Sequence, residues 1–194
     1  MADPANECFV LRRQDGSLTG EMKPSALVRR DGVLHGASHD FLVRLRGGGA
    51  ELLLQKRSAQ KDSFPGLYDI SAAGHLDPGE DFAAAARREL AEELGVTGKE
   101  PEFLLGHLNE YHGAFHGKPF HDKEIAWVYL LVLDRPEEAF TPEACEVESV
   151  HWFSVREILR AMRENDPRFC LREAEFCRLL PYLAQKFGIP VDKL

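Results

Sequence analysis

The segment from Asp81 to Leu94 constrains the fold of this chain more than any other. It is rich in alanine, contains no internal glycine or proline, and is followed by Gly95, a residue that favours the end of a helix. We therefore expect a helix over 81–94. Its apolar side chains share one face, where they can pack against a sheet: Ala83, Ala86, Leu90 and Leu94.

Carboxylates share the adjoining face of this helix, because Glu89, Glu92 and Glu93 are spaced i, i+3 and i+4. Such like charges repel one another unless water or a cation neutralises them. A solvated acidic surface is one interpretation. The other is a site for a divalent cation, since Mg²⁺ prefers carboxylate oxygens and keeps water molecules that a phosphate substrate can replace.

Short apolar runs on both sides of this helix predict strands. Two hairpins precede the helix and three strands follow it: Cys8–Arg13 with Ser17–Met22, Asp40–Arg46 with Glu51–Arg57, then Glu102–His112, Glu124–Leu133 and Val147–Phe153. Residues 58–79 predict one long loop. Ser154 can cap a helix that ends near Arg163, and a last helix over 172–187 contains Pro181, which we expect to kink or split it. Strands interleaved with three helices indicate an α/β chain with a mixed sheet.

The net charge of −8 argues against nonspecific binding of nucleic acid, whose affinity depends on neutralised phosphates. No apolar run approaches the roughly 20 residues of a membrane helix, and residues 1–7 lack the basic and apolar parts of a secretory signal. We therefore expect a cytoplasmic protein that binds neither membrane nor nucleic acid. The four cysteines form no CxxC pair, which favours reduced thiols over a zinc site.

A longer pattern surrounds the clustered glutamates. Gly74 is followed after five residues by Glu80, after seven more by Arg88-Glu89-Leu90, and then by Ala91-Glu92-Glu93-Leu94-Gly95-Val96. This pattern, G-x5-E-x7-R-E-U-x-E-E-x-G-U with U apolar, resembles the Nudix box at every fixed position. A chance match in a chain of this length is on the order of one in ten million or rarer.

The resemblance implies a Nudix-type α/β/α sandwich with a mixed sheet, to which this chain adds an N-terminal hairpin and extra C-terminal helices. It also implies hydrolysis of a phosphoanhydride with Mg²⁺ or Mn²⁺ as cofactor. By motif position, Glu92 and Glu93 would bind the metal at the catalytic centre, and Glu89 would bind it or activate the attacking water. Arg88 would orient Glu89.

Two further positions of the box would complete this centre. Glu80 would act on a second metal ion through water, and the backbone carbonyl near Ala73 or Gly74 would be a further metal ligand. Without the box as context, Arg88 would be expected to form a surface ion pair with Glu92. Glu80 would then be interpreted as an acidic residue favoured near the start of a helix.

The segments Leu53–Lys61 and Phe64–His75 resemble the branch of this family that contains isopentenyl diphosphate isomerase. That enzyme uses a cysteine just before the glycine-histidine pair, where this chain has Ala73. Moving a double bond needs two groups that transfer protons, and the thiol would be one of them. With the thiol absent and the R-E-U-x-E-E core intact, the resemblance implies an isomerase-like hydrolase.

Other residues match positions of the isomerase branch. Two of the isomerase's metal-binding histidines match His75 and His35 of this chain. The histidine that comes first in the isomerase sequence corresponds to a position near Leu27 or Val28, where this chain has no histidine. Its paired acidic residues match Asp122 and Glu124, and its diphosphate-binding residues match Arg57 and Lys61. We expect Arg57, Lys61 and His75 to bind the substrate and Glu124 to be a further metal ligand or base. Solvated charges at strand ends are the alternative for Arg57, Lys61 and Glu124.

Histidines and aromatic residues gather between residues 107 and 121. Four histidines lie on one expected strand and the loop that follows it: His107, His112, His116 and His121. None has zinc spacing, and we expect those on the loop to be exposed or to face the substrate rather than to bind metal. Packing within the protein is favoured for Tyr111, Phe115 and Phe120, with stacking on a base as the alternative.

We expect residues 1–194 to form a single domain, with an N-terminal hairpin and linker over 1–36, a core over 37–153 and C-terminal helices over 154–194. The expected activity is Mg²⁺- or Mn²⁺-dependent cleavage of a phosphoanhydride in a nucleoside di- or triphosphate or a nucleoside diphosphate derivative. Hydrolysis of a small organic, isoprenoid-like diphosphate is one alternative, and nucleotide binding without cleavage, as in a sensor, is another. The expected partner is a small-molecule diphosphate, and a homodimer is common in the family.

Overall fold

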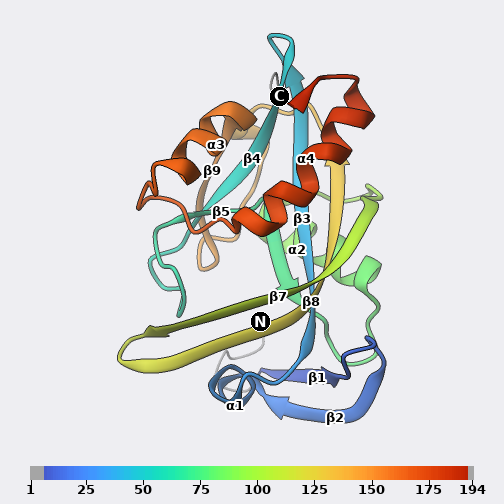
Figure 1. Ribbon diagram of the computed structural model, residues 1–194, viewed down its shortest axis with the longest axis vertical. Helices are drawn as coiled ribbons and strands as arrows, with labels where there is room; N and C mark the ends of the chain where they lie inside the picture. The colour runs from blue at the N-terminus through green and yellow to red at the C-terminus, as the bar shows by residue number, and fades with distance from the viewer. Residues whose placement is uncertain (1–6, 192–194) are drawn as a thin grey trace.

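The computed structural model describes residues 7–191, which form a mixed sheet with helices on both faces (Figure 1). Residues 1–6, where the sequence predicts no secretory signal, and 192–194 lie outside the described part. The elements in chain order are β1 Cys8–Arg12, β2 Leu18–Pro24, α1 Ser25–Asp31, β3 His35–Arg46, β4 Gly49–Arg57, β5 Tyr68–Asp69, β6 Ala72–His75, α2 Phe82–Leu94, β7 Glu102–Phe115, β8 Lys118–Val132, the 3-10 helix η2 Glu137–Ala139, β9 Val147–Ser154, α3 Val155–Arg163 and α4 Glu173–Phe187. No helix among residues 7–191 is both long and apolar enough to cross a membrane.

Strand β3 is the centre of the sheet, because β1, β4, β6 and β8 all pair with it. β8 runs parallel to it and places Glu124 beside His35. On the other edge of β3, β6 pairs antiparallel and places His75 beside Ala37. The register of these three strands therefore brings residues that are distant in the sequence to one end of β3.

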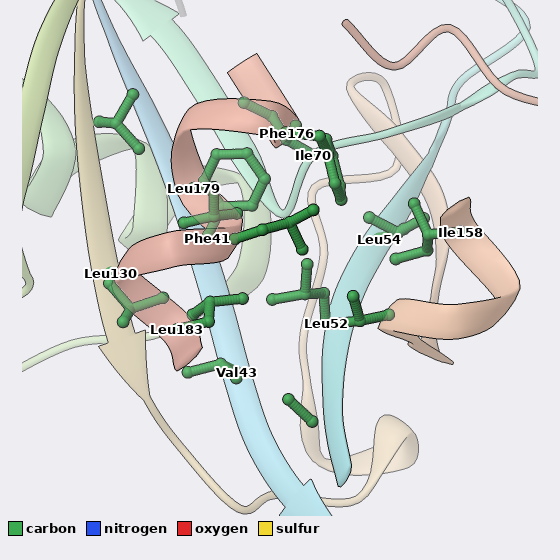
Figure 2. Packing of buried hydrophobic residues seen from close by; sticks show 14 residues of the cluster. Phe41, Val43, Leu52, Leu54, Ile70, Leu130, Ile158, Phe176, Leu179 and Leu183 are labelled. Carbon is green, nitrogen blue, oxygen red and sulfur yellow. The ribbon is translucent and has the colours of Figure 1, made fainter. Parts of the chain in front are cut away.

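Alternate side chains of β3 enter two separate cores, as expected for a strand buried on both faces. Phe41 and Val43 pack with apolar residues of α3 and α4, and Figure 2 shows these side chains interlocking between the helices and strands β3 and β4. Leu42 faces the opposite way and packs with Leu90 and Leu94 of α2. Helix α2 thus covers one face and α3 and α4 the other, which confirms the α/β/α sandwich with a mixed sheet.

The helices begin and end close to the predicted residues. The Asp81 side chain caps α2 by accepting a hydrogen bond from Ala84 N at 2.7 Å, and Gly95 ends the helix in the left-handed conformation. Ser154 caps α3 through a capping box with Glu157. Helix α4 is not split at Pro181, because its apolar residues on both sides of the proline are held in the core.

Several other expectations were wrong. The loop expected over 58–79 contains β5 and β6, and β6 is built from small residues that pair because β3 offers a free edge. Strands β7 and β8 extend beyond the expected ends to form one long hairpin (Figure 1). Its turn contains His116 and Gly117, both with positive φ, which suits a tight two-residue turn. The segment between the N-terminal hairpin and β3 holds the short helix α1, which was not predicted from the sequence.

Candidate active site

The carboxylates of α2 lie against β6. The Glu93 carboxylate accepts hydrogen bonds from the backbone N–H of Ala73 at 3.0 Å and from Gln55 Nε2 at 2.8 Å. One turn earlier, Glu89 lies over Gly74, so close that a Cβ on residue 74 would collide with its carboxylate. The glycine of the Nudix box is therefore required here for the close approach of helix and strand.

Arg88 binds the predicted residues Glu80 and Glu89 together. Its guanidinium donates two hydrogen bonds to the Glu80 carboxylate, at 2.9 and 3.1 Å, and one to Glu89 Oε1 at 2.6 Å. It also donates to the carbonyl of His75 at 2.8 Å and contacts Glu92 at 3.2 Å. This arrangement fits the expected role of Arg88 in orienting Glu89. The surface pair between Arg88 and Glu92 is present as well, and the Glu92 side chain is half exposed.

Three buried carboxylates meet beneath α2, and the sequence identified only two of them. Burial raises the pKa of Glu89, to which the charge of Glu93 adds, and burial also raises the pKa of Glu93. The third is Asp40 of β3, whose pKa is raised well above its usual range by burial and then by Glu89 and Glu93. Both Asp40 oxygens are buried without a hydrogen-bond partner among the described residues. Carboxylates of this kind fit a hard divalent cation.

The basic residues expected to bind diphosphate lie close to this group. Arg57 pairs with Asp69 at 3.2 Å and also donates to Ser63, while Lys61 forms an ion pair with Glu146. Both positive charges oppose the burial that raises the pKa of Glu93. They are thus held by neighbours rather than freely solvated.

A second group lies on the opposite face of β3 and β6. Four of its side chains bring ligand atoms within 4.8 Å of one another: His35, His75, Asp122 and Glu124. His75 Nε2 lies 3.2 Å from Glu124 Oε1, and His35 Nε2 lies 3.5 Å from Asp122 Oδ1. His35 Nε2 and Asp122 Oδ1 are buried without a hydrogen-bond partner among the described residues. Imidazole and carboxylate donors with unpaired buried atoms fit a transition-metal ion.

The N-terminal hairpin and the β7–β8 hairpin enclose this second group. Phe9 of β1 stacks on the rings of both His35 and His75, with centroids 4.7 and 4.0 Å apart. Asn109 of β7 donates a hydrogen bond to Glu124 at 2.9 Å. Glu124, which was expected as a further metal ligand or base, therefore contacts histidines and Asn109 rather than the carboxylates of α2. His75, which was expected to bind the substrate, belongs to this second group as well.

Sequence reasoning missed His39 and Glu175, which meet His107 in this region. His39 Nδ1 lies 2.7 Å from Glu175 of α4, and His107 Nε2 lies 3.2 Å from the same carboxylate oxygen. Burial alone would raise the pKa of Glu175, but His39 and His107 outweigh it and hold the value at about 2. In the sequence His39 stands between Ser38 and Asp40, and Glu175 stands two residues after Glu173, so neither was distinguished from ordinary surface residues.

The aromatic residues of the β7–β8 hairpin pack together and against the loop before β5. Phe64, which has a positive φ of 50°, contacts the rings of Tyr111 and Phe115, and Phe115 contacts Phe120. The guanidinium of Arg172 lies 4.3 Å from the Tyr111 ring centre. Of the histidines expected on the loop, His116 is exposed and His121 is half-buried, and His112 of β7 is exposed as well.

Comparison with known proteins agrees with this geometry. The sequence model of the NUDIX domain matches residues 38–173, and the chain belongs to the Nudix family. It is 36% identical over 197 residues to Nudix hydrolase 3 of Arabidopsis thaliana, a match covering 97% of this chain but 25% of that protein, so the chain spans about a quarter of this relative's length.

The chain also falls in the isomerase-like branch of the family. It is 30% identical over 165 residues to the isopentenyl-diphosphate Delta-isomerase of Paenarthrobacter aurescens, with 85% of each chain covered. Among solved structures, a Deinococcus radiodurans protein superposes with a TM-score of 0.63 at 20% identity, covering 81% of this chain and 90% of that one, which is a likeness of fold.

Proposed function

We propose that this protein is a Mg²⁺- or Mn²⁺-dependent hydrolase that cleaves a phosphoanhydride bond in a nucleoside di- or triphosphate or a nucleoside diphosphate derivative. The observation that carries the proposal is the complete Nudix box in its folded form, with Glu89 and Glu93 buried together over β6 and Arg88 bound to Glu80 and Glu89. Buried carboxylates that repel one another gain most when a cation binds between them.

Each residue of the box has a separate task in this reaction. Glu89, Glu92, Glu93 and the Gly74 carbonyl would hold the metal, which when bound polarises the phosphate and lowers the pKa of a bound water. Arg88 fixes the rotamer of Glu89, so that this carboxylate can bind metal or accept the proton of the attacking water. Arg57 and Lys61 supply positive charge for a diphosphate close to Glu93.

The isomerase reaction is disfavoured by one position. Ala73 and His75 alternate with Gly74 on β6, so the Ala73 side chain faces the histidine side of the strand. A methyl group there cannot transfer a proton, and the second proton-transfer group of an isomerase is absent from this position. The isomerase-like loop nevertheless favours a small organic diphosphate as the second candidate substrate.

The test is phosphate release with Mg²⁺ over nucleotides, nucleotide sugars and organic diphosphates, with and without an added phosphatase. Signal that requires the phosphatase identifies cleavage inside a diphosphate. The double variant Glu92→Gln, Glu93→Gln should lower turnover by at least about 100-fold, because the bound metal stabilises transition-state charge. Glu100→Gln, an exposed glutamate paired with Arg87, is the control and should leave turnover unchanged. Nucleotide binding without any turnover would contradict the proposal and favour a sensor.

A further inference from the structure

The β7–β8 hairpin carries a further set of ligand atoms on its outer face, the face turned away from His35 and His75. His112 of β7 pairs with His121 of β8, and Glu110 of β7 pairs with Lys123. Residues that pair across two strands share a face of the sheet, and so do residues two apart in one strand. Asn109 points the other way, into the group that the hairpin encloses.

Three of these side chains converge on one point. His121 Nε2 lies 2.8 Å and His112 Nε2 lies 3.2 Å from the same oxygen, Glu110 Oε1. All three ligand atoms lie within 4.8 Å of one another. Donor atoms bound at about 2.1 Å in a tetrahedral zinc site are about 3.4 Å apart, so these atoms need to separate by only roughly 0.2–0.6 Å to admit an ion.

Packing against α1 sets the position of His121. Gly32 ends α1 in the left-handed conformation, and a Cβ on this residue would collide with the His121 ring beside Nδ1. Figure 1 shows the hairpin passing beside α1. His121 therefore has its Nδ1 beside the Gly32 backbone and its Nε2 beside Glu110. The ring of His112 lies next to that of His121, with centroids 3.7 Å apart, so the two imidazoles are held together.

One positive charge opposes a cation at this point. Lys123 Nζ lies 3.8 Å from Glu110 Oε1, which is beyond hydrogen-bond distance. The lysine side chain is a flexible four-carbon stem, so its ammonium can turn into solvent when an ion binds at Glu110. Lys123 should therefore lower the affinity for a cation without occupying the ligand atoms.

We infer that Glu110, His112 and His121 form a Zn²⁺ site on the outer face of the hairpin, with water as the remaining ligand. Two imidazoles and one carboxylate are ligands that suit this ion. The sequence shows no zinc spacing here because the ligands come from two strands and meet only through their register. A bound ion would link β7 to β8 and, through His121, hold the hairpin beside α1. The inference goes beyond the proposed function, since it involves neither a substrate nor the carboxylates of α2.

The test is titration of the full chain with Zn²⁺ in excess Mg²⁺ and at low salt, followed by calorimetry. The group of His35 and His75 can also take up Zn²⁺, but no variant alters a member of that group, so differences between variants report the outer site. His112→Gln and His121→Gln should each weaken binding at this site by at least about 10-fold, because each removes one of three protein ligands. Lys123→Gln should strengthen it by about 2- to 5-fold, because a repelling charge is removed.

His116→Gln is the matched control. His116 is an exposed imidazole in the turn of the same hairpin and forms no ion pair among residues 7–191. Its replacement should change the affinity by less than about 2-fold. The inference is overturned if His112→Gln binds Zn²⁺ as the unaltered protein does. It is also overturned if His116→Gln weakens binding as much as His112→Gln, or if Lys123→Gln does not bind more tightly.

Should a variant fail to fold, anomalous scattering at the zinc absorption edge from zinc-soaked crystals of the unaltered protein decides. A peak between Glu110, His112 and His121 supports the inference, and no peak there contradicts it. Because no substrate is used, a protein that binds Zn²⁺ at this site but releases no phosphate would contradict the proposed function alone.

Discussion

Gly74 of β6 and Glu89 of α2 are in such close contact that residue 74 has no room for a Cβ beside the Glu89 carboxylate. The Glu89 carboxylate therefore packs directly against the backbone of β6. Gly74→Ala should displace Glu89 and lower turnover by about 10- to 100-fold, because a shift of about 1 Å in a catalytic group is enough for such a loss.

The control for this substitution is Gly79→Ala. Gly79 has a positive φ and no atom near the position of a Cβ, so its replacement adds backbone strain without touching Glu89. Turnover is measured with the substrate found in the panel, and folding by thermal melting. Equal turnover in Gly74→Ala and the unaltered protein would mean that the placement of Glu89 does not limit the reaction.

Asp40 is expected to destabilise the metal-free protein. Its folded-state pKa is raised above the unfolded value, so the stability it contributes in acid is lost as the pH rises. Asp40→Asn should therefore raise the unfolding free energy at neutral pH by about 1 kcal/mol or more, and Tm by about 2–4 °C. Thermal melts in the presence of a chelator measure the change. Asp134→Asn, which alters an exposed partner of Arg46, should shift Tm by less than about 1 °C.

Local spacing explains why part of the site could be predicted. The carboxylates of α2 belong to one helix, and their i, i+3, i+4 positions determine a shared face without knowledge of the rest of the fold. The cap at Asp81 and the end at Gly95 are equally local, and the structure has both. The fold class followed because these elements match a known family pattern.

The histidine group depends instead on register. His35, His75 and Glu124 come from three strands, and no one of these strands reveals how the three pair. Glu175, which contacts His39, comes from α4, 136 residues after His39. The first residues of β3, 35–39, were not predicted as strand, because polar residues such as His39 and Asp40 interrupt the apolar pattern there. The strand was expected to begin at Asp40. His39 is buried against Glu175, and Asp40 is buried against Glu89 and Glu93, whose like charges raise its pKa. Propensity alone does not reveal such neighbours.

Removal of metal should make stability depend on pH. Burial and mutual repulsion raise the pKa of Glu89 to about 8, and burial raises that of Glu93 to about 7, both above the unfolded value of 4.5. The folded state then holds more protons than the unfolded state between about pH 4.5 and 8, so the stability of the metal-free protein falls as pH rises through this range. Thermal melts from pH 5 to 8 in chelator should show falling Tm.

Added Mg²⁺ should reverse this dependence, because protons and the cation compete for the same oxygens. The gain in Tm on adding Mg²⁺ should therefore be larger at pH 8 than at pH 5. The double variant Glu89→Gln, Glu93→Gln should lose most of this difference. A gain that is the same at both pH values would mean that the two carboxylates are not where Mg²⁺ binds.

Arg88 donates several hydrogen bonds from one planar guanidinium, and this geometry should matter for turnover. Its guanidinium reaches Glu80, Glu89 and the His75 carbonyl at once, which a lysine ammonium of the same charge cannot do in one geometry. Arg88→Lys should therefore lower kcat by about 10-fold or more with little change in KM, because it loosens Glu89 and leaves Arg57 and Lys61 in place for the diphosphate. Arg87→Lys, which alters only an exposed pair with Glu100, is the neighbouring control and should leave kcat unchanged. If Arg88→Lys raised KM at constant kcat, Arg88 would be binding the substrate rather than positioning Glu89.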